Sequence, residues 1–450
     1  MTRATRVVDG ARVPVAVVGG GQAGLSISWH LTRRSVEHVV LERDRVGHDW
    51  ADRRWDAFTL VTPNWQCRLP GYPYAGDDPD GFMTRDEVLA WIRGYADSFD
   101  APVVERVLVT RLRDAAAGGF EVVTDQGTIV AEQVVIATGG YHRPVLPAAA
   151  ARIPDGIRQV HSADYRSPEA LPDGAVLVVG SGQSGAQIAE DLHLADRQVH
   201  LALGSAPRCA RRYRGRDCIA WLEDMGVYDI PVTAHVGGLT KRESTNHYMT
   251  GRGGGRDIDL RAFAREGMRL HGRLAGAEGT RLAFTPTVGA SLDHADSVME
   301  SIKDDIDRHI ARAGVDAPTE PRYVPVWRPE REETGLDLAE AGITSIVWAA
   351  GYRSDYSWVQ VGAFDGSGHP MHQRGSSAVA GLHFLGLPWL HTWGSGRFAA
   401  IARDAEHLAD RIEERSGDRA ADRTPAGAMD STAERATQHA GAGVGAAWSG

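Results

Sequence analysis

Short apolar runs recur along the chain, and many of them are followed by a glycine-rich turn or a helical pattern with one polar face. Residues 13–18 form such a run, a glycine turn follows, residues 23–33 have the spacing of an amphipathic helix, and residues 38–41 form a second run. Continuous apolar runs are typical of parallel strands that are covered on both faces. The order predicts a strand, a helix and a second parallel strand, which is the βαβ unit of an α/β protein.

The same order returns later in the chain. Residues 175–180 form an apolar run, residues 186–195 have the pattern of an amphipathic helix, and residues 199–203 form the next run. Two more segments are predicted to be extended: residues 120–140, which alternate as a hairpin around an Asp-Gln-Gly turn, and residues 343–351, whose small C-terminal residues resemble those at the end of the hairpin. The unit is therefore used twice.

We expect an α/β fold with two Rossmann-like dinucleotide-binding domains, the first discontinuous and the second inserted into it. The first domain would comprise residues 1–170 and 323–415, and the second residues 171–322 with a helical insertion at about residues 224–317. Residues 416–450 contain Ala, Gly and charged residues with almost no large apolar side chains. Such a composition cannot bury enough surface to order itself, so a disordered tail is predicted.

Charge and cysteine content limit the partners and the compartment. The 450 residues carry 49 Lys and Arg against 59 Asp and Glu, a net charge of −10, and no run reaches the roughly 18 apolar residues of a membrane helix. We expect small-molecule partners, no nucleic acid and no membrane, and leave a homodimer open. Cys67, Cys209 and Cys218 are too few and too far apart for a disulfide framework, and the N-terminal residues lack the apolar stretch of a signal peptide. A cytoplasmic location is expected.

The first glycine turn has the dinucleotide-binding pattern. Gly19, Gly21 and Gly24 follow the strand and begin the helix, where they allow a tight turn, close approach of a pyrophosphate and close helix packing. Glu42 ends the second strand, where an acid binds the ribose hydroxyls of an adenine dinucleotide. The residues assigned to this site are completed by Gln22, Ala23 and Arg43.

The second turn has the same spacing at Gly180, Gly182 and Gly185, and Gln183 and Ser184 lie within it. No carboxylate stands near residues 203–205, at the place equivalent to Glu42, and an arginine-rich stretch follows. A missing acid and nearby guanidinium groups favour NADPH over NADH, because the 2′-phosphate is then attracted rather than repelled. We assign Ser205, Arg208 and Arg211 to this site, with a solvated basic loop as the alternative.

Two dinucleotide sites in one chain indicate a flavoprotein oxidoreductase. Residues 13 to about 412 resemble the class B FAD- and NADPH-dependent monooxygenases, which include flavin-containing and Baeyer–Villiger enzymes. The resemblance depends on GGGQAG, VLER, GHDWADRRWDAFTLVTP, VVIATGG, HSADYR, GSGQSG, VWAAGYR and LGLPWLHTWGSGRF. The segments TPNWQCRLPGYPY, GDDPDGFM and SAPRCARRYRGRD are most similar to a bacterial subgroup often encoded beside nitrilases.

The resemblance implies further site residues. Trp50 and Arg54 would border the flavin, with core packing as the alternative for the tryptophan, and Thr62 and Asn64 would lie near its reactive face. Where the chain passes between the domains beside the cofactors, the implied residues are Thr138, Gly139 and Gly351.

A C-terminal segment is also implicated by the resemblance. The segment begins at Gly386 and contains the sequence GSGR. GSGR would open a helix, predicted at residues 398–414, whose first N–H groups would point at the flavin. His391, Trp393 and Arg397 are the implied catalytic residues here, together with Asn64, and a structural role for His391 is the alternative.

The Baeyer–Villiger fingerprint is incomplete. Asp155 stands where that fingerprint has Phe, whereas His161 keeps its histidine and is expected to position the linker between the domains. The Baeyer–Villiger reaction is therefore less favoured than other oxygenations.

The resemblance implies that NADPH reduces FAD and that O₂ then forms a C4a-(hydro)peroxyflavin, which oxygenates a small organic compound, with nitrogen-containing substrates as one class. An NADPH oxidase or electron-transfer reductase without oxygen insertion is the alternative. A dithiol reductase is disfavoured because no C-x-x-C is present, and a nucleotide-sensing protein because the aromatic segments resemble a flavin pocket. No metal is expected, since no histidine lies in a ligand motif.

Overall fold

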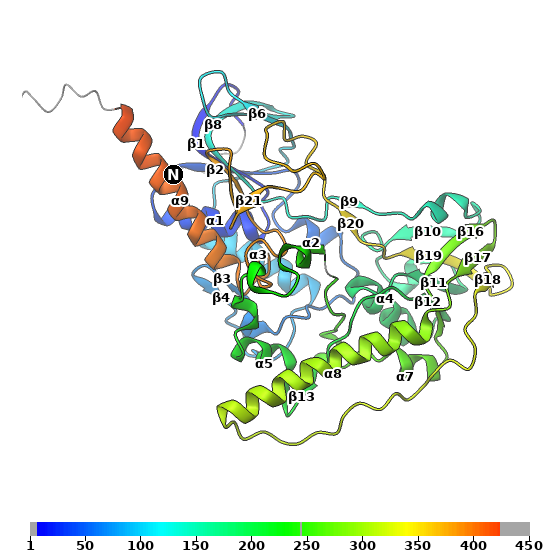
Figure 1. Ribbon diagram of the computed structural model, residues 1–450. Helices are drawn as coiled ribbons and strands as arrows, with labels where there is room; N and C mark the ends of the chain where they lie inside the picture. The colour runs from blue at the N-terminus through cyan, green and yellow to red at the C-terminus, as the bar shows by residue number, and fades with distance from the viewer. Residues whose placement is uncertain (1–6, 244, 424–450) are drawn as a thin grey trace, which may run out of the picture.

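The computed structural model describes residues 7–243 and 245–423. Two lobes, each built on its own sheet, lie side by side, and the long helix α8 (Val288–Ala313) runs beneath them from the second lobe toward the first (Figure 1). Both sheets are covered by helices, and the two βαβ units begin one lobe each. The predicted α/β class with two Rossmann-like units is confirmed.

The first sheet has the order β21-β22-β23-β8-β1-β2-β5, and β6 and β7 extend from β8 as an antiparallel meander. Its central strand buries Val15, Ala16 and Val17 completely, as expected for a strand covered on both faces. The predicted hairpin is present, with β7 paired to β8 across the Asp-Gln-Gly turn. The strands are β1 (Arg12–Val18), β2 (His38–Glu42), β5 (Val103–Glu105), β6 (Val109–Asp114), β7 (Phe120–Thr124), β8 (Gly127–Ile136), β21 (His372–Gln373), β22 (Ser376–Ser377) and β23 (Leu382–Phe384).

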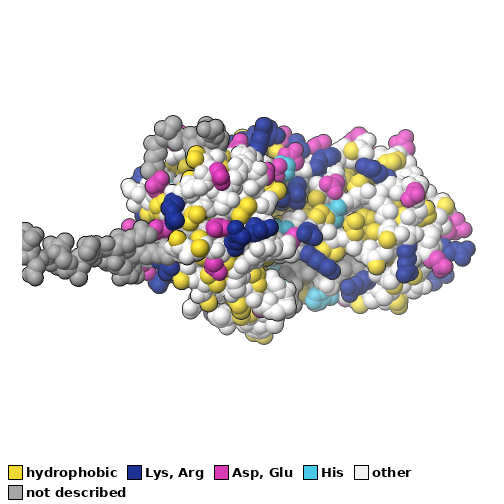
Figure 2. Space-filling model, turned by 90° about the horizontal axis from the view of Figure 1, so that it is seen from above, with side chains coloured by type: hydrophobic (Ala, Val, Ile, Leu, Met, Phe, Trp, Pro, Cys, Tyr) yellow, Lys and Arg dark blue, Asp and Glu magenta, His cyan; other side chains and the backbone are white. Residues whose placement is uncertain are grey.

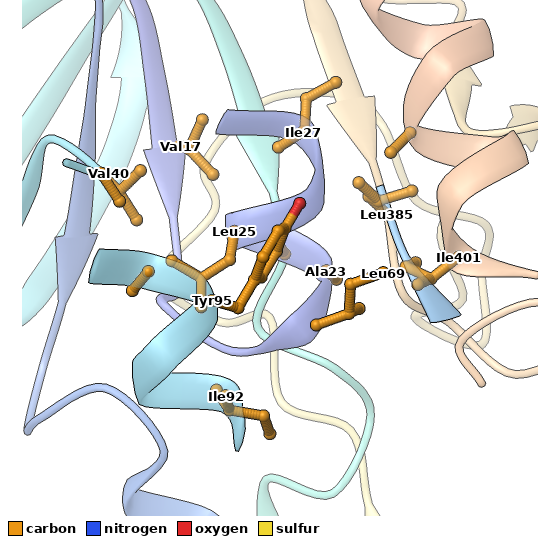
Figure 3. Packing of buried hydrophobic residues seen from close by; sticks show 14 of the residues in the cluster. Val17, Ala23, Leu25, Ile27, Val40, Leu69, Ile92, Tyr95, Leu385 and Ile401 are labelled. Atoms are coloured by element: carbon orange, nitrogen blue, oxygen red, sulfur yellow. The ribbon is translucent and has the colours of Figure 1, made fainter. Parts of the chain in front are cut away.

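Helix α1 (Gln22–Arg33) packs on β1 and β2 of this sheet, and α3 (Arg85–Ser98) and α9 (Ile401–Arg423) pack on α1. Figure 3 shows Tyr95 of α3 among Leu25, Ile92 and other apolar side chains, with residues from the C-terminal part of the chain closing the cluster. The first core is thus shared by segments from both ends of the chain, which explains why the first domain is discontinuous.

Helix α9 differs from its prediction at both ends. It begins at Ile401 rather than at residue 398, and it continues to Arg423, so residues 416–423 are helical and not part of a disordered tail. Gln133 of the first sheet donates hydrogen bonds to Ile412 O at 2.9 Å and Ser416 Oγ at 3.1 Å, which holds this part of the helix. Residues 424–450, the rest of the predicted tail, lie outside the described residues.

The second sheet is entirely parallel and has the order β10-β19-β11-β12-β15. Its strands are β10 (Arg158–His161), β11 (Ala175–Val179), β12 (Val199–Ala202), β15 (Arg269–His271) and β19 (Ile343–Trp348), and helix α4 (Gln183–Leu194) connects β11 to β12. The predicted domain limits therefore need correction. β10 precedes residue 171 and β19 follows residue 322, yet both belong to the second sheet.

The physical reason for this error is an equivalence between two strands. β8 lies beside β1 in the first sheet, and β19 lies beside β11 in the second. Each ends in small residues next to a glycine turn: a Cβ at Gly19 would lie 2.7 Å from Ala137 O, and a Cβ at Gly180 would lie 2.5 Å from Ala349 O. The similarity of the two strand ends reflects the same role in different domains, not a return to the first domain.

The predicted insertion contains more strand than expected. It includes β15, which joins the second sheet, and the antiparallel β16 and β17, which pair with β18. Its helices include α8, which contacts the second core through Leu292 and a separate cluster around Trp221 through Ile306. The remaining elements are α2 (His48–Asp52), α5 (Cys218–Asp224), α6 (Arg252–Gly255), α7 (Leu260–Arg265), β3 (Arg68–Leu69), β4 (Tyr72–Pro73), β9 (Arg143–Pro144), β13 (Arg212–Tyr213), β14 (Arg216–Asp217), β16 (Leu274–Glu278), β17 (Arg281–Phe284), β18 (Gly335–Asp337) and β20 (Tyr352–Arg353).

Surface charge is mixed. Figure 2 shows basic and acidic side chains interspersed over the face it presents. In the described part of the chain, no helix has both the length and the apolar character needed to cross a bilayer.

Candidate functional site

The first glycine turn has two closed positions and one open position. Gly19 has φ +109°, and a Cβ at Gly24 would lie 1.8 Å from Gly19 O, so both positions require glycine for the turn itself. A Cβ at Gly21 would meet nothing within 4 Å. Helix α1 begins directly after Gly21 without a side-chain cap. Its first N–H groups and the open face at Gly21 fit the pyrophosphate of a dinucleotide.

Glu42 lies against this turn. Its carboxylate accepts hydrogen bonds from Gly20 N at 2.7 Å and Asp44 N at 2.9 Å. Burial raises the pKa of Glu42, while the two N–H groups oppose that shift. The carboxylate is therefore fixed at the end of β2, where a ribose would be bound. Arg43 is exposed instead and pairs with Asp44 at 3.0 Å.

Trp50 and Arg54 lie at the edge of the first core. Trp50 stacks on Phe398 with ring centroids 5.7 Å apart, and the Arg54 guanidinium lies 5.1 Å from the Trp50 ring centroid. Trp50 is partly buried and Arg54 stays partly exposed. The stacking of Trp50 on Phe398 joins the segment after β2 to the C-terminal segment that precedes α9.

Asn64 acts on its own loop. It is buried, its Nδ2 donates to Asp78 O at 2.9 Å, and its Oδ1 accepts from Met83 N at 2.8 Å. Both polar groups of the amide are thus used by the backbone. The structure supports a positioning role, in which Asn64 fixes the loop that contains the half-buried Thr62.

The C-terminal loop packs directly on the first glycine turn. A Cβ at Gly386 would lie 2.6 Å from Ala23 Cβ, and the Gln22 side chain donates to Gly396 O at 3.2 Å. The helix predicted to open with GSGR does not begin there, because residues 394–400 form turns and α9 begins at Ile401. The loop is instead held by Ser395, whose Oγ donates to the buried Asp404 carboxylate at 2.6 Å.

Aromatic side chains from the insertion cover this loop. Trp393 stacks on Tyr228 with centroids 4.8 Å apart, and Arg397 lies 4.7 Å from the Trp393 centroid. Both Trp393 Nε1 and Arg397 Nη2 donate to Asn246 Oδ1, at 3.1 and 3.0 Å. His391 accepts a backbone hydrogen bond from Val232 at 2.7 Å. Residues 227–243 and 245–249 of the second domain therefore contact the loop that the first domain presents.

The His391 side chain is partly exposed. Its pKa is lowered, mainly by burial and then by the positive charge of Arg374. The ring is therefore predominantly neutral near pH 7.

The second glycine turn repeats the geometry of the first. Gly180 has φ +105°, a Cβ at Gly185 would lie 1.9 Å from Gly180 O, and a Cβ at Gly182 would approach nothing closer than Thr245 Cγ2 at 4.0 Å. Helix α4 begins after Gly182 without a side-chain cap. This site also fits a pyrophosphate. The Gln183 side chain binds Met249 N and O, and Ser184 is partly buried.

The two arginines assigned to the 2′-phosphate are placed elsewhere. Arg208 is 3% exposed and pairs with Asp296 at 2.6 Å, and Arg211 is 2% exposed and pairs with Asp217 at 2.5 Å. Their guanidinium groups are buried and are paired with partly buried carboxylates, so this assignment needs correction. Ser205 is exposed in the segment that follows β12.

The chain crosses between the lobes where expected. β9 follows Gly139 and pairs with β20, which follows Gly351. Tyr356 donates to Gly139 O at 3.1 Å, and His142 binds Thr138 O at 3.3 Å. His161 bridges to this crossing: its Nδ1 accepts from Ala163 N, and its Nε2 lies 3.2 Å from Gly351 O. Burial lowers the pKa of His161, which favours the neutral ring that both bonds require.

Sequence reasoning missed a cavity between the lobes. Its volume is about 540 Å³, and it separates the loop at Pro63 and Trp65 from the hairpin β13–β14 and helix α5. The charged residues that line it are Asp80, Arg212, Arg216, Asp217, Glu223 and Asp224. No signal in the sequence brings these two segments together. Among the described residues, no group of His, Cys, Asp and Glu side chains is arranged to hold a metal ion.

Comparisons with known proteins agree with this architecture. A family model described as pyridine nucleotide-disulphide oxidoreductase matches residues 16–222. An uncharacterized CzcO-like oxidoreductase of Geobacillus kaustophilus is 31% identical over 404 residues, which cover 89% of this chain and 98% of the relative. A probable indole-3-pyruvate monooxygenase of Arabidopsis thaliana, YUCCA4, is 32% identical over 194 residues, 42% of this chain and 46% of that protein.

The fold is shared with a solved flavin-containing monooxygenase of Stenotrophomonas maltophilia. The TM-score is 0.61 at 19% sequence identity, with 90% of this chain and 99% of that chain covered. At this level of identity the likeness concerns the fold.

Proposed function

The chain belongs to the family of CzcO-like oxidoreductases, and we propose from this premise that it is a monooxygenase that uses FAD, NADPH and O₂ to oxygenate a small organic substrate. The observation that carries the proposal is the cover of the C-terminal loop. Trp393 and Arg397 of the first domain share Asn246 of the second domain as a hydrogen-bond acceptor, directly beside the first glycine turn. A closed site is what an oxygenating flavin requires, because water must be excluded.

The residues of the chain would divide the work. The turn at Gly21 and the carboxylate of Glu42 hold FAD, which supplies hydride acceptance and O₂ activation when bound. The turn at Gly182 holds the diphosphate of NADPH. Asn64 fixes the loop that borders the cavity, and residues 227–243 and 245–249 keep water from the C-terminal loop.

The cavity is proposed to admit the substrate. Trp65 supplies an apolar wall, and the carboxylate of Asp80 is exposed at the cavity. A small nitrogen-containing compound that carries a positive charge would be attracted by such a carboxylate. Membership of the subgroup that is often encoded beside nitrilases remains a prediction, and it points to the same class of nitrogen-containing substrates.

A reductase that acts on disulfides is less well supported. Cys218 is completely buried, and its pKa is raised well above its usual value by the contact with Cys209 and by burial. A thiol kept protonated in the interior is a poor nucleophile. An NADPH oxidase without oxygen insertion is the second candidate, and the cover over the C-terminal loop favours oxygen insertion over it.

The test combines a spectrum with a stoichiometry. The purified protein is expected to be yellow, to bleach with NADPH under anaerobic conditions, and to pass through a persistent absorbance change before oxidised flavin returns with O₂. With amines and sulfides screened as substrates, one compound should lower the peroxide released per NADPH and take up one atom of ¹⁸O from ¹⁸O₂. Peroxide equal to NADPH with every compound would instead establish the oxidase.

A further inference from the structure

The correction of Arg208 and Arg211 leaves the 2′-phosphate of NADPH without an assigned partner. The other arginines of that stretch are also engaged: Arg214 binds Asp307 at 2.8 Å, and Arg216 binds Asp224 at 2.7 Å. Arg212 donates to Gly254 O at 3.2 Å. The charge that would recognise the phosphate has to come from another segment of the second domain.

The place where the phosphate would lie follows from the sheet. In a dinucleotide fold, the adenosine ribose is bound just past the second strand of the unit, here β12. Gly204 and Ser205 occupy that place, and neither carries a charge. The next strand along this edge is β15, which is parallel to β12, so both carboxyl ends open on the same side.

The register brings one arginine to this place. His200 pairs with Arg269, Leu201 with Leu270 and Ala202 with His271. The pairing extends beyond the strands, because Leu203 N donates to His271 O at 2.9 Å. Gly204 follows the last residue of β12 by two positions, and Arg273 follows the last residue of β15 by two positions, so both segments leave the sheet at the same edge. We propose that Arg273 binds the 2′-phosphate of NADPH and gives the enzyme its preference over NADH.

The backbone of Arg273 is held firmly. Its N–H donates to Thr287 Oγ1 at 3.2 Å, and its carbonyl accepts from Thr285 N at 2.9 Å. A Cβ at the preceding Gly272 would lie 1.7 Å from Thr285 O, so this close approach depends on glycine. A fixed backbone reduces the conformational entropy lost when the guanidinium binds a phosphate.

The side chain of Arg273 is available for a ligand. Arg273 is exposed and forms no ion pair with another described residue, in contrast to Arg208 and Arg211. The nearby Glu332 carboxylate is committed to Val288 N at 3.1 Å and Gly289 N at 2.9 Å, at the start of α8. A planar guanidinium matches a phosphate with two parallel hydrogen bonds.

The test measures binding of nucleotide fragments by calorimetry on the FAD-loaded protein. The probes are 2′,5′-ADP, which carries the 2′-phosphate, and 5′-AMP, which lacks it. Arg273→Gln is expected to weaken 2′,5′-ADP binding about 10- to 100-fold, the range of a charge-assisted bidentate contact, and to leave 5′-AMP binding within about twofold. Arg273→Lys should keep part of the difference, because it retains charge without the fork.

Arg269→Gln is the matched control, since Arg269 is exposed at the start of β15, whereas Arg273 lies just past the end of that strand. It should leave both affinities unchanged. Equal losses for the two probes in Arg273→Gln, or no loss for either, would overturn the proposal. Because the inference rests on NADPH as the hydride donor, bleaching of the flavin is measured in parallel. If the flavin of the Arg273→Gln variant still bleaches with NADPH, and the variant distinguishes 2′,5′-ADP from 5′-AMP as well as the wild type does, the role of Arg273 is refuted. The proposal that the protein is a monooxygenase is then unaffected.

Discussion

Arg252, in the glycine-rich loop formed by residues 251–255, lies 2.5 Å from Asp191, a buried carboxylate on helix α4 whose other oxygen accepts from Tyr165 at 2.7 Å. Two residues of this loop also contact the first domain: a Cβ at Gly251 would lie 2.0 Å from Leu60 O, and one at Gly255 would lie 2.7 Å from Phe82. The loop therefore joins the helix of the second dinucleotide turn to the loop that borders the cavity. Its glycines serve close packing between domains.

This ion pair yields a prediction about stability. Asp191→Ala removes a carboxylate that is 2% exposed and leaves Arg252 and the Tyr165 hydroxyl without their partner. We expect the free energy of unfolding to fall by about 2 kcal/mol, measured by urea denaturation. Arg411→Ala is the control, because its pair with Glu414 is exposed on both sides and should contribute less than about 0.5 kcal/mol. Equal effects of the two substitutions would contradict the role given to the buried pair.

The glycine turns could be predicted because their pattern is local. The spacing of Gly19, Gly21 and Gly24 specifies the turn within one βαβ unit, and the structure places each where expected. The arginine assignments could not be predicted in the same way. Arg208 pairs with Asp296, which lies 88 positions later in the chain, since 296 − 208 = 88. Asp296 belongs to α8, so this pairing depends on how α8 packs against the rest of the second domain.

The end of β19 shows a second limit. Its sequence is similar to that of β8 because both strands flank a glycine turn, and only the pairing of strands tells which turn each one flanks. The cavity shows the same limit, since its two walls meet only when the lobes are assembled.

A Gly→Ala substitution in the first turn should have different consequences at positions where a methyl group would clash and at the position where it would meet open space. Gly21→Ala adds a methyl group to open space in the protein itself, so the fold should keep its stability while FAD binding weakens at least tenfold. Gly24→Ala sets a methyl group 1.8 Å from Gly19 O, so it should lower the melting temperature and yield little folded protein. Thermal melting of the flavin-free proteins and FAD titration separate the two effects.

A turn that tolerated Ala at position 24 would show that the close approach of α1 to β1 is not required. Loss of folding in Gly21→Ala would show that the open face is structural and not a binding surface.

A buried histidine pair predicts a pH dependence of stability. His200 Nδ1 lies 2.9 Å from His271 Nε2, and burial lowers the pKa of each ring to about 4. The unfolded pKa is about 6.5, so the stability that depends on the neutral rings is fully present above pH 6.5 and is lost as the pH falls toward 4. Between pH 7.5 and pH 5.5, each ring should lower the free energy of unfolding by about 1 kcal/mol.

The double variant His200→Asn, His271→Gln has no titrating group at these positions. Its free energy of unfolding in urea should therefore change less between pH 7.5 and 5.5 than that of the wild type, by about 2 kcal/mol. An unchanged pH dependence would mean that both rings titrate in the folded protein as they do in the unfolded chain.

The contact between Trp393 and Asn246 predicts a change in coupling. Trp393→Phe keeps an aromatic ring to stack on Tyr228 but removes the Nε1 donor, and Asn246→Ala removes the shared acceptor of Trp393 and Arg397. Both variants should loosen the cover over the C-terminal loop and admit water, so the peroxide released per NADPH should rise about twofold or more while FAD content stays constant. Trp358→Phe, which changes a partly buried ring packed against the core of the first sheet, is the control and should leave this ratio unchanged. If Asn246→Ala lowered FAD content and left the peroxide ratio as in the wild type, residues 227–243 and 245–249 would support the flavin site rather than exclude water from it.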